Sequence, residues 1–183
     1  MNISLSFIRN LFKKTEEPLS SGSRKKILFD VLTPPLSKLG LTRYDGEYIW
    51  YSDFNHEGIR KVFKYTLMKG NTGLFCWGVC FKHVPTVTNS KRLQYHKSEK
   101  NIALHLWEWP AGYSVSVENG VMPADLISHS NDRRFRQELL EIFGKYRIAI
   151  EQWYVRADTL QGCLEITDQQ IESGGVYRMR WPT

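Results

Sequence analysis

Apolar residues recur at helical spacing near both ends of this chain and alternate with polar residues in its middle. Residues 2–14 place Ile3, Leu5, Phe7, Ile8, Leu11 and Phe12 on one wide arc, which predicts an amphipathic helix over residues 1–14. The segment 15–23 (TEEPLSSGS) contains Pro, Gly and four hydroxyl side chains, so we interpret it as a linker. Ser23 then caps a predicted second helix, which Pro34-Pro35 ends or kinks.

From Glu47 onward the hydrophobic period is 2, which is typical of strands. A first strand alternates Tyr48, Trp50 and Phe54 with Ile49, Tyr51 and Asp53. A second strand covers 59–68, with Phe63, Tyr65 and Leu67 on one face and Arg60, Lys64 and Thr66 largely on the other. A third covers 74–83 with apolar residues on both faces, as in a central strand. The turn-forming segments 55–58 and 69–73 are short, so these strands run antiparallel.

After the third predicted strand, the pattern predicts in turn a loop, further strands and helices. Residues 85–101 form a polar loop, and strand character follows at 102–109 and 113–118. Asn131 or Asp132 caps a predicted helix with an apolar stripe, which Trp153, Leu160 and Leu164 extend toward residue 173, while 176–181 alternates like a last strand. We therefore predict one α+β domain over 24–183. It has a leading helix, an antiparallel meander of roughly five strands, and C-terminal helices packed on one face.

Composition supports a folded domain. The chain has 183 residues, of which 42% are hydrophobic, enough for a core of ordinary size, and this excludes disordered and fibrous classes. No apolar run approaches the length of a transmembrane helix. Three cysteines are too few for a disulfide scaffold, and in MNISLSFIRNLFKK the charges follow the apolar residues instead of preceding them. We therefore expect a cytoplasmic protein.

The positive charge is unevenly distributed. The net charge is +6, but residues 1–26 contribute +4 and leave +2 for the other 157 residues. This nearly neutral body argues against a domain built as a whole for nucleic acid.

The candidate catalytic and metal-binding residues do not form a recognised motif. Cys76 and Cys80 lie on one predicted strand, about 13 Å apart, too far to share one zinc ion, so we expect two core thiols and no metal or cofactor. His105 and Glu108 fall on opposite faces of a strand. An enzyme would need His105, Glu108 or Cys163 to converge with other polar groups in a pocket.

Two basic segments and one aromatic segment are candidate binding residues. A loop at 90–100 interleaves cations with an aromatic ring and could contact phosphates, or be a solvated loop: Lys91, Arg92, Tyr95, Lys97, Lys100. Arg133, Arg134 and Arg136 add cations at a helix start, where the helix dipole favours anions. Trp107 and Trp109 share a strand face, as core side chains or as anchors of an interface.

The N-terminal helix has three interpretations. It is basic and amphipathic, so it suits an anionic membrane surface or a groove on a partner protein. It is also short, which favours docking on the protein's own sheet through the 15–23 tether.

Residues 24–85 resemble a bacterial domain family of unknown function, in which a helix ending in a Leu-rich step leads into antiparallel strands. The matching residues are packing positions: Leu32, Leu36, Leu39-Gly40-Leu41, Tyr48, Trp50-Tyr51, Val62-Phe63 and Phe75–Val79. Proteins of this kind resemble small immunity proteins found beside polymorphic or secreted toxins. The resemblance implies inhibition by stoichiometric binding, without cofactor or catalytic residue.

The sequence thus favours a non-enzymatic protein-binding module of the immunity or inhibitor type. Because inhibitors of cationic nuclease toxins tend to be acidic and this chain is not, we expect a toxin with an acidic or neutral face. The alternative is a nucleic-acid-binding accessory protein that uses the 90–100 loop and the basic N-terminus. Salt distinguishes the two, because phosphate binding weakens steeply as salt rises.

Overall fold

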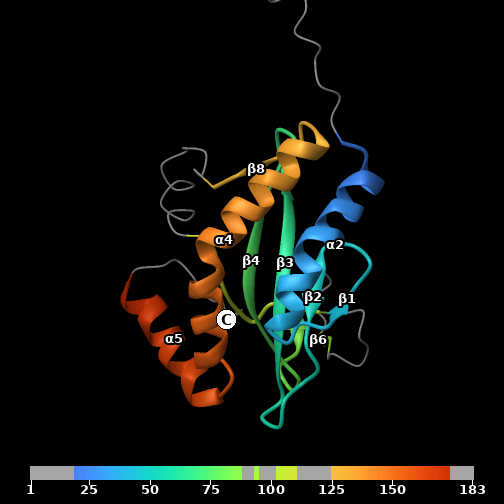
Figure 1. Cartoon of the computed structure of the whole chain (residues 1–183). Helices are drawn as coiled ribbons and strands as arrows, with labels where there is room; N and C mark the ends of the chain where they lie inside the picture. Colours follow the sequence, from blue (N-terminus) through green and yellow to red (C-terminus); the bar gives the residue numbers. More distant parts are fainter. Residues whose placement is uncertain (1–18, 88–92, 95–101, 111–124, 174–183) are drawn as a thin grey trace, which may run out of the picture.

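The computed structural model describes residues 19–87, 93–94, 102–110 and 125–173 (Figure 1). Its elements follow the order α2 (Ser21–Lys38), β1 (Arg43–Tyr44), β2 (Ile49–Tyr51), β3 (Ile59–Met68), β4 (Thr72–Phe81), β5 (Thr86–Val87), β6 (Leu93–Gln94), β7 (Leu106–Glu108), β8 (Ile127–Ser128), α4 (Asp132–Arg156) and α5 (Leu160–Glu172). The α+β class predicted from the pattern is confirmed. The predicted helix 1–14, strand 113–118 and strand 176–181 lie outside the described residues, as do residues 15–18 of the predicted linker.

The sheet is antiparallel and is built around the β3–β4 hairpin. The strand order is β1-β2-β3-β4-β7, and β8 also pairs with β4, at its opposite end from β7. The hairpin turn at 69–71 is tight because Gly70 and Asn71 both take positive φ values, 76° and 56°. The turn predicted at 69–73 and the central position predicted for the third strand are both confirmed.

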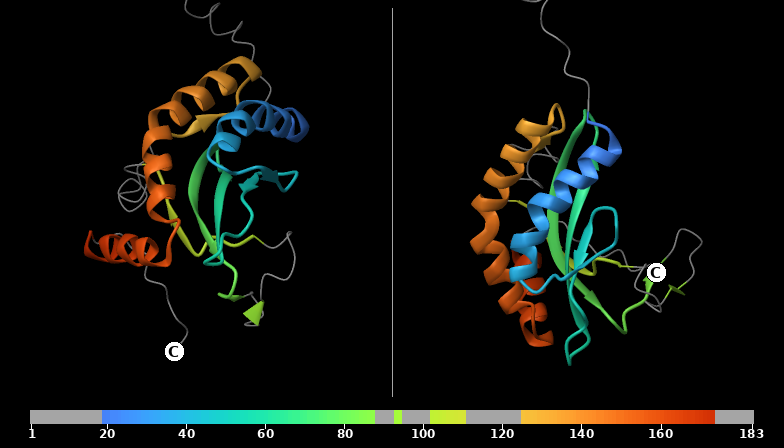
Figure 2. Two further views of the ribbon diagram at one scale, coloured as in Figure 1. Left: turned by 60° about the horizontal axis from the view of Figure 1, so that its bottom comes forward. Right: turned by 45° about the vertical axis from the view of Figure 1, so that its right-hand side comes forward.

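Helices α2 and α4 lie side by side over one face of the sheet (Figures 1 and 2). Odd-numbered residues of β3 and β4 point toward these helices, so Phe63, Tyr65, Phe75 and Trp77 pack against Phe143 and its neighbours in one aromatic core. Even-numbered residues point to the other face, which we call the back face. A smaller buried cluster of Tyr51, Val62 and Cys80 lies there.

Helix α2 starts three residues earlier than predicted, and of the two outcomes expected at Pro34-Pro35, an end or a kink, the helix does not end there. Ser20, not Ser23, is the N-cap, and its Oγ accepts a hydrogen bond from the Ser23 amide, so 21–23 are helical and not linker. The helix continues through Pro34-Pro35 to Lys38. Leu32 and Leu36, both fully buried, hold the turns on either side of the prolines against the sheet. Tertiary packing thus overrides the helix-breaking tendency of proline.

Two predicted strands are shorter than expected. The first ends at Tyr51, after which the chain bends, so Phe54 packs with Tyr51 on the back face and not on the face of Trp50. The strand predicted at 102–109 is reduced to 106–108. Within the region predicted as a polar loop, β5 and β6 pair as a separate two-stranded sheet.

The C-terminal helical region is confirmed but is broken into two helices. Asn131 caps α4, and its Oδ1 accepts from the Arg134 amide. After Ala157 a second helix begins at Leu160 with Thr159 as its N-cap. The break rotates the apolar stripe, so Leu160 and Leu164 are exposed while Cys163 and Ile166 are buried. The prediction that Leu160 and Leu164 continue the buried stripe was therefore wrong.

Candidate functional site

A hollow of about 360 Å³ lies on the back face. Its lining comes from four strands and from the segments on either side of β7: Ile49, Val62, Lys64, Thr66, Cys76, Ile102, Ala103, Leu104, Trp107 and Trp109. This volume lies within the range of sites that hold a small ligand or an inserted side chain. The hollow is the strongest candidate for a functional site among the described residues.

Strand register brings the floor of the hollow together. Lys64 of β3 lies between Ile49 of β2 and Cys76 of β4 in the pairing, so these three residues form one row across the sheet. Val62 and Thr66 lie two positions to either side of Lys64 and therefore share its face. The floor is apolar except for one ammonium group and one hydroxyl.

The wall of the hollow carries Trp107 and Trp109, which are both half-buried. Trp107 pairs with Gly78 of β4, and a Cβ atom on Gly78 would lie only 2.3 Å from the Leu106 carbonyl oxygen. Glycine at this position therefore permits β7 to approach β4. On the other side, the Gln170 side-chain amide of α5 donates to the Trp107 carbonyl oxygen at 3.0 Å, so β7 is held from both sides.

Two cations, Lys64 and Arg60, lie in or near the hollow among the described residues. Lys64 is the one charged side chain among the described residues that line the hollow. Nearby on β3, Arg60 is only 6% exposed and its guanidinium carbon lies 4.1 Å from the Phe54 ring centroid and 4.9 Å from that of Tyr51. Its Nε has no hydrogen-bond partner in the described part of the chain. The two cations favour an anionic group on whatever binds here.

The thiol in the hollow is not activated. Burial raises the pKa of Cys76 to about 12, and the nearby charge of Lys64 only partly opposes this. A thiol with such a pKa is protonated near neutral pH and is a poor nucleophile. The hollow is thus suited to binding and not to nucleophilic attack by Cys76. The prediction that Cys76 and Cys80 are buried thiols on one strand is confirmed.

Of the candidate binding residues singled out from the sequence, the two tryptophans and the three arginines lie in the described part of the chain. Trp107 and Trp109 lie together in the hollow, at its wall. The loop residues Lys91, Arg92, Tyr95, Lys97 and Lys100 lie outside the described residues.

The three arginines at the start of α4 are not an open basic surface. Arg134 pairs with Glu138 at 2.6 Å, and Arg136 pairs with Asp30 of α2 at 3.5 Å. Two of the three charges are therefore compensated by acidic partners, which reduces their attraction for phosphate groups. The acidic partner Asp30 comes from a different helix, so sequence spacing gives no sign of it.

The three residues of the enzyme hypothesis have separate partners in the described contacts. His105 Nδ1 accepts from the Phe81 amide, and Glu108 accepts from Gln170. Cys163 donates to the Ala157 carbonyl oxygen, and burial raises its pKa to about 11. These contacts do not assemble a catalytic group from the three. Within the described ranges there is also no cluster of three His, Cys, Asp or Glu side chains placed to hold a metal ion.

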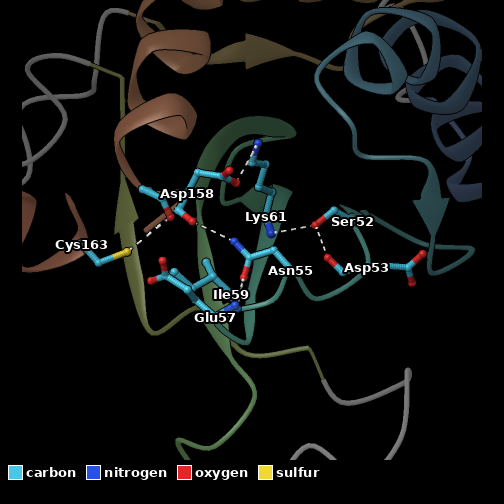
Figure 3. A network of polar contacts seen from close by, with 9 residues as sticks. Ser52, Asp53, Asn55, Glu57, Ile59, Lys61, Asp158 and Cys163 are labelled. Carbon is cyan, nitrogen blue, oxygen red and sulfur yellow. Dashed lines mark hydrogen bonds and ion pairs between the residues drawn. The ribbon is translucent and has the colours of Figure 1, made fainter. Parts of the chain in front are cut away.

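A second polar network joins the 52–61 region to the α4–α5 turn (Figure 3). Asn55 Nδ2 donates to the Asp158 carbonyl oxygen at 2.8 Å, and Lys61 Nζ lies 3.3 Å from Asp158 Oδ1. Glu57 accepts from the Leu160 amide at the first turn of α5. These bonds satisfy a helix end and a turn, so the network has a structural role.

Sequence reasoning missed most of the floor of the hollow. Arg60, Lys64 and Thr66 were expected to share a face of the second strand, and they do. The pairing of Lys64 with Ile49 and Cys76 depends on strand register, and the pairing of β7 with β4 depends on a long connection, so no local signal could have shown the hollow.

Comparison of the chain with family models, with curated proteins and with solved structures gave no match. Across the described residues, none of the helices combines the length and the apolar character that crossing a membrane requires.

Proposed function

We propose that this protein works by stoichiometric binding of another protein, and that the back-face hollow is where the partner inserts. The single observation that carries the proposal is the hollow itself, of about 360 Å³, with Trp107 and Trp109 on its wall. Tryptophan is enriched among the residues that dominate binding energy at protein interfaces. A pocket of this size accepts one large side chain of a partner.

The charges of the back face define the partner further. The floor is apolar around Lys64, and Arg60 lies on the same face of β3. We infer a partner segment that presents an apolar or aromatic side chain with a carboxylate close to it. This agrees with the expectation of a toxin that has an acidic or neutral face.

The inhibitor part of the proposal rests on the resemblance of residues 24–85 to immunity-type proteins. Such a protein would neutralise a toxin by binding over the toxin's active surface. We propose that this binding takes place in the cytoplasm. The nucleic-acid alternative gains little support from the described residues, because Arg134 and Arg136 are paired with acids.

The test begins with affinity purification of the tagged full chain from its native cells, in parallel with two charge-reversed variants. Lys64→Glu reverses the charge in the hollow, and Lys82→Glu reverses an exposed charge at the end of β4 as a matched control. The co-purified protein is then produced separately, and its complex with each variant is weighed by native mass spectrometry and titrated by calorimetry.

We expect a 1:1 complex whose affinity falls at least about tenfold for Lys64→Glu and is unchanged for Lys82→Glu. We also expect the partner to be harmful when produced alone and harmless when produced with this protein. Equal affinity for both variants would remove the hollow as the site. An eluate dominated by nucleic acid that is lost on raising the salt would favour the alternative function.

A further inference from the structure

Arg60 of β3 is a buried cation without an acidic partner in the described part of the chain. The residue is only 6% exposed, and its Nε is buried without a hydrogen-bond partner. The ion pairs between described residues join other cations to acids, and Arg60 is in none of them. A buried ion without such a partner is costly, and an anion supplied by a ligand would remove this cost.

The surroundings of Arg60 fix its position without neutralising its charge. Its guanidinium carbon lies 4.1 Å from the Phe54 ring centroid and 4.9 Å from that of Tyr51. Its pairing partner on β4 is Cys80, and burial raises the pKa of this thiol, which is therefore neutral. Aromatic rings stabilise a nearby cation but carry no net charge. The positive charge of Arg60 is thus left uncompensated among these neighbours.

The free groups of Arg60 suit an oxyanion. A guanidinium is a planar fork of N–H donors that can bind both oxygens of one carboxylate. The two Nη atoms are not among the buried atoms without partners, and the hydrogen bonds between described residues do not use them, so a ligand can reach them. The two aromatic rings already restrict the side chain, so binding costs less conformational entropy than it would for a free arginine.

Arg60 lies beside the hollow and is not part of its lining. It precedes Lys64 by four residues on β3, so the two Cα atoms are about 13 Å apart. Val62, between them on the same face, belongs both to the lining of the hollow and to the apolar cluster that includes Tyr51 and Cys80. Arg60 therefore marks a second position next to the hollow.

We propose that Arg60 is an anion-binding residue whose ligand is a carboxylate group. One guanidinium balances the single charge of a carboxylate. A phosphate dianion would keep a negative charge in surroundings that consist of two rings and a neutral thiol, which is unfavourable. The source of the carboxylate rests on the proposed function, since we assign this group to an Asp or Glu side chain of the partner that inserts into the hollow.

The site itself is tested on the full chain without a partner. The Nε–Hε NMR signal of Arg60, identified by its proximity to the rings of Phe54 and Tyr51, is followed during titration with sodium acetate and, at equal ionic strength, with sodium chloride. We expect a saturable shift with acetate, with a dissociation constant on the order of millimolar, and none with chloride. Lys64→Gln should leave this titration unchanged. No saturable shift, or an equal shift with chloride, overturns the proposal, and tighter binding of inorganic phosphate than of acetate overturns the choice of carboxylate.

The source of the carboxylate is tested on the complex with the co-purified partner. Arg60→Lys keeps the positive charge but loses the fork of donors, so we expect it to weaken the complex at least about tenfold. A complex weakened by Lys64→Glu but not by Arg60→Lys would retain the hollow and overturn the role of Arg60 in partner binding. Acetate binding at Arg60 together with a complex that neither variant weakens would support the carboxylate site and overturn the hollow as the docking site.

Discussion

Acid should destabilise this protein through the buried side chain of His129. His129 is 1% exposed, and its Nε2 lies 2.6 Å from the hydroxyl oxygen of Tyr65. Its ring packs edge-on against Phe135, with the centroids 4.9 Å apart. Its backbone also accepts from the Leu19 amide and donates to the Asn71 carbonyl oxygen. The residue thus joins the start of α2, the β3–β4 turn and the start of α4.

The size of this loss of stability in acid follows from the pKa of His129. Burial, and to a smaller extent the positive charge of Arg24, lowers this pKa from 6.5 to about 4, and the negative charge of Glu138 opposes the shift. The folded protein therefore prefers the neutral imidazole. Between pH 4 and 6.5 the unfolded chain binds more protons than the folded one, so stability rises with pH in this window. A shift of this size corresponds to about 3 kcal/mol, fully present above pH 6.5 and lost toward pH 4.

The assay is urea unfolding followed by tryptophan fluorescence at a series of pH values from about 7.5 to about 4. The matched variant is His129→Gln, which keeps a neutral hydrogen-bonding side chain near Tyr65 but does not titrate. Carboxylates titrate in both proteins, so the difference between the two pH profiles isolates His129. Parallel profiles across this window would refute the reasoning, because the titration of His129 would then contribute nothing to stability.

Three further predictions concern the hollow, the α4–α5 turn and the thiols. Gly78→Ala should destabilise the protein by about 2 kcal/mol and weaken partner binding, measured by calorimetry, because the new methyl group displaces β7. Thr159→Ala should cost about 1 kcal/mol in urea unfolding through loss of the α5 cap. Gly162→Ala should cost about 3 kcal/mol in urea unfolding, because its Cβ would lie 1.8 Å from the Arg156 carbonyl oxygen. Equal losses of stability for Thr159→Ala and Gly162→Ala would contradict this account. Burial raises the pKa of every cysteine thiol, so the native protein should react with a thiol reagent far more slowly than the unfolded chain.

The fold class could be predicted from the sequence because its signals are local. Alternation along 59–68 and 74–83 determines which side chains share a face, and the short segment 69–73 forces the two strands into a hairpin. The same applies to α4, whose apolar residues repeat at helical spacing and whose cap is Asn131.

Where local signals and packing disagreed, packing prevailed. Pro34-Pro35 predicts the end of a helix or a kink, and α2 does not end there because Leu32 and Leu36 on either side are buried against the sheet. Leu160 and Leu164 extend the apolar spacing of α4, yet the turn at 157–159 starts a new helix and turns them outward.

The candidate site, too, could be predicted from the sequence only in part. From the sequence alone it follows that Trp107 and Trp109 share a strand face and that Arg60, Lys64 and Thr66 share another. Only the tertiary structure determined that the two tryptophans and Lys64 line one hollow, and that Arg134 and Arg136 have acidic partners. The physical reason is the separation along the chain between the residues that determine each feature. The alternation of side chains in a strand is set by neighbouring peptide units. A hollow, by contrast, depends on which strands pair and in which register, and that is decided by contacts between residues far apart in the chain.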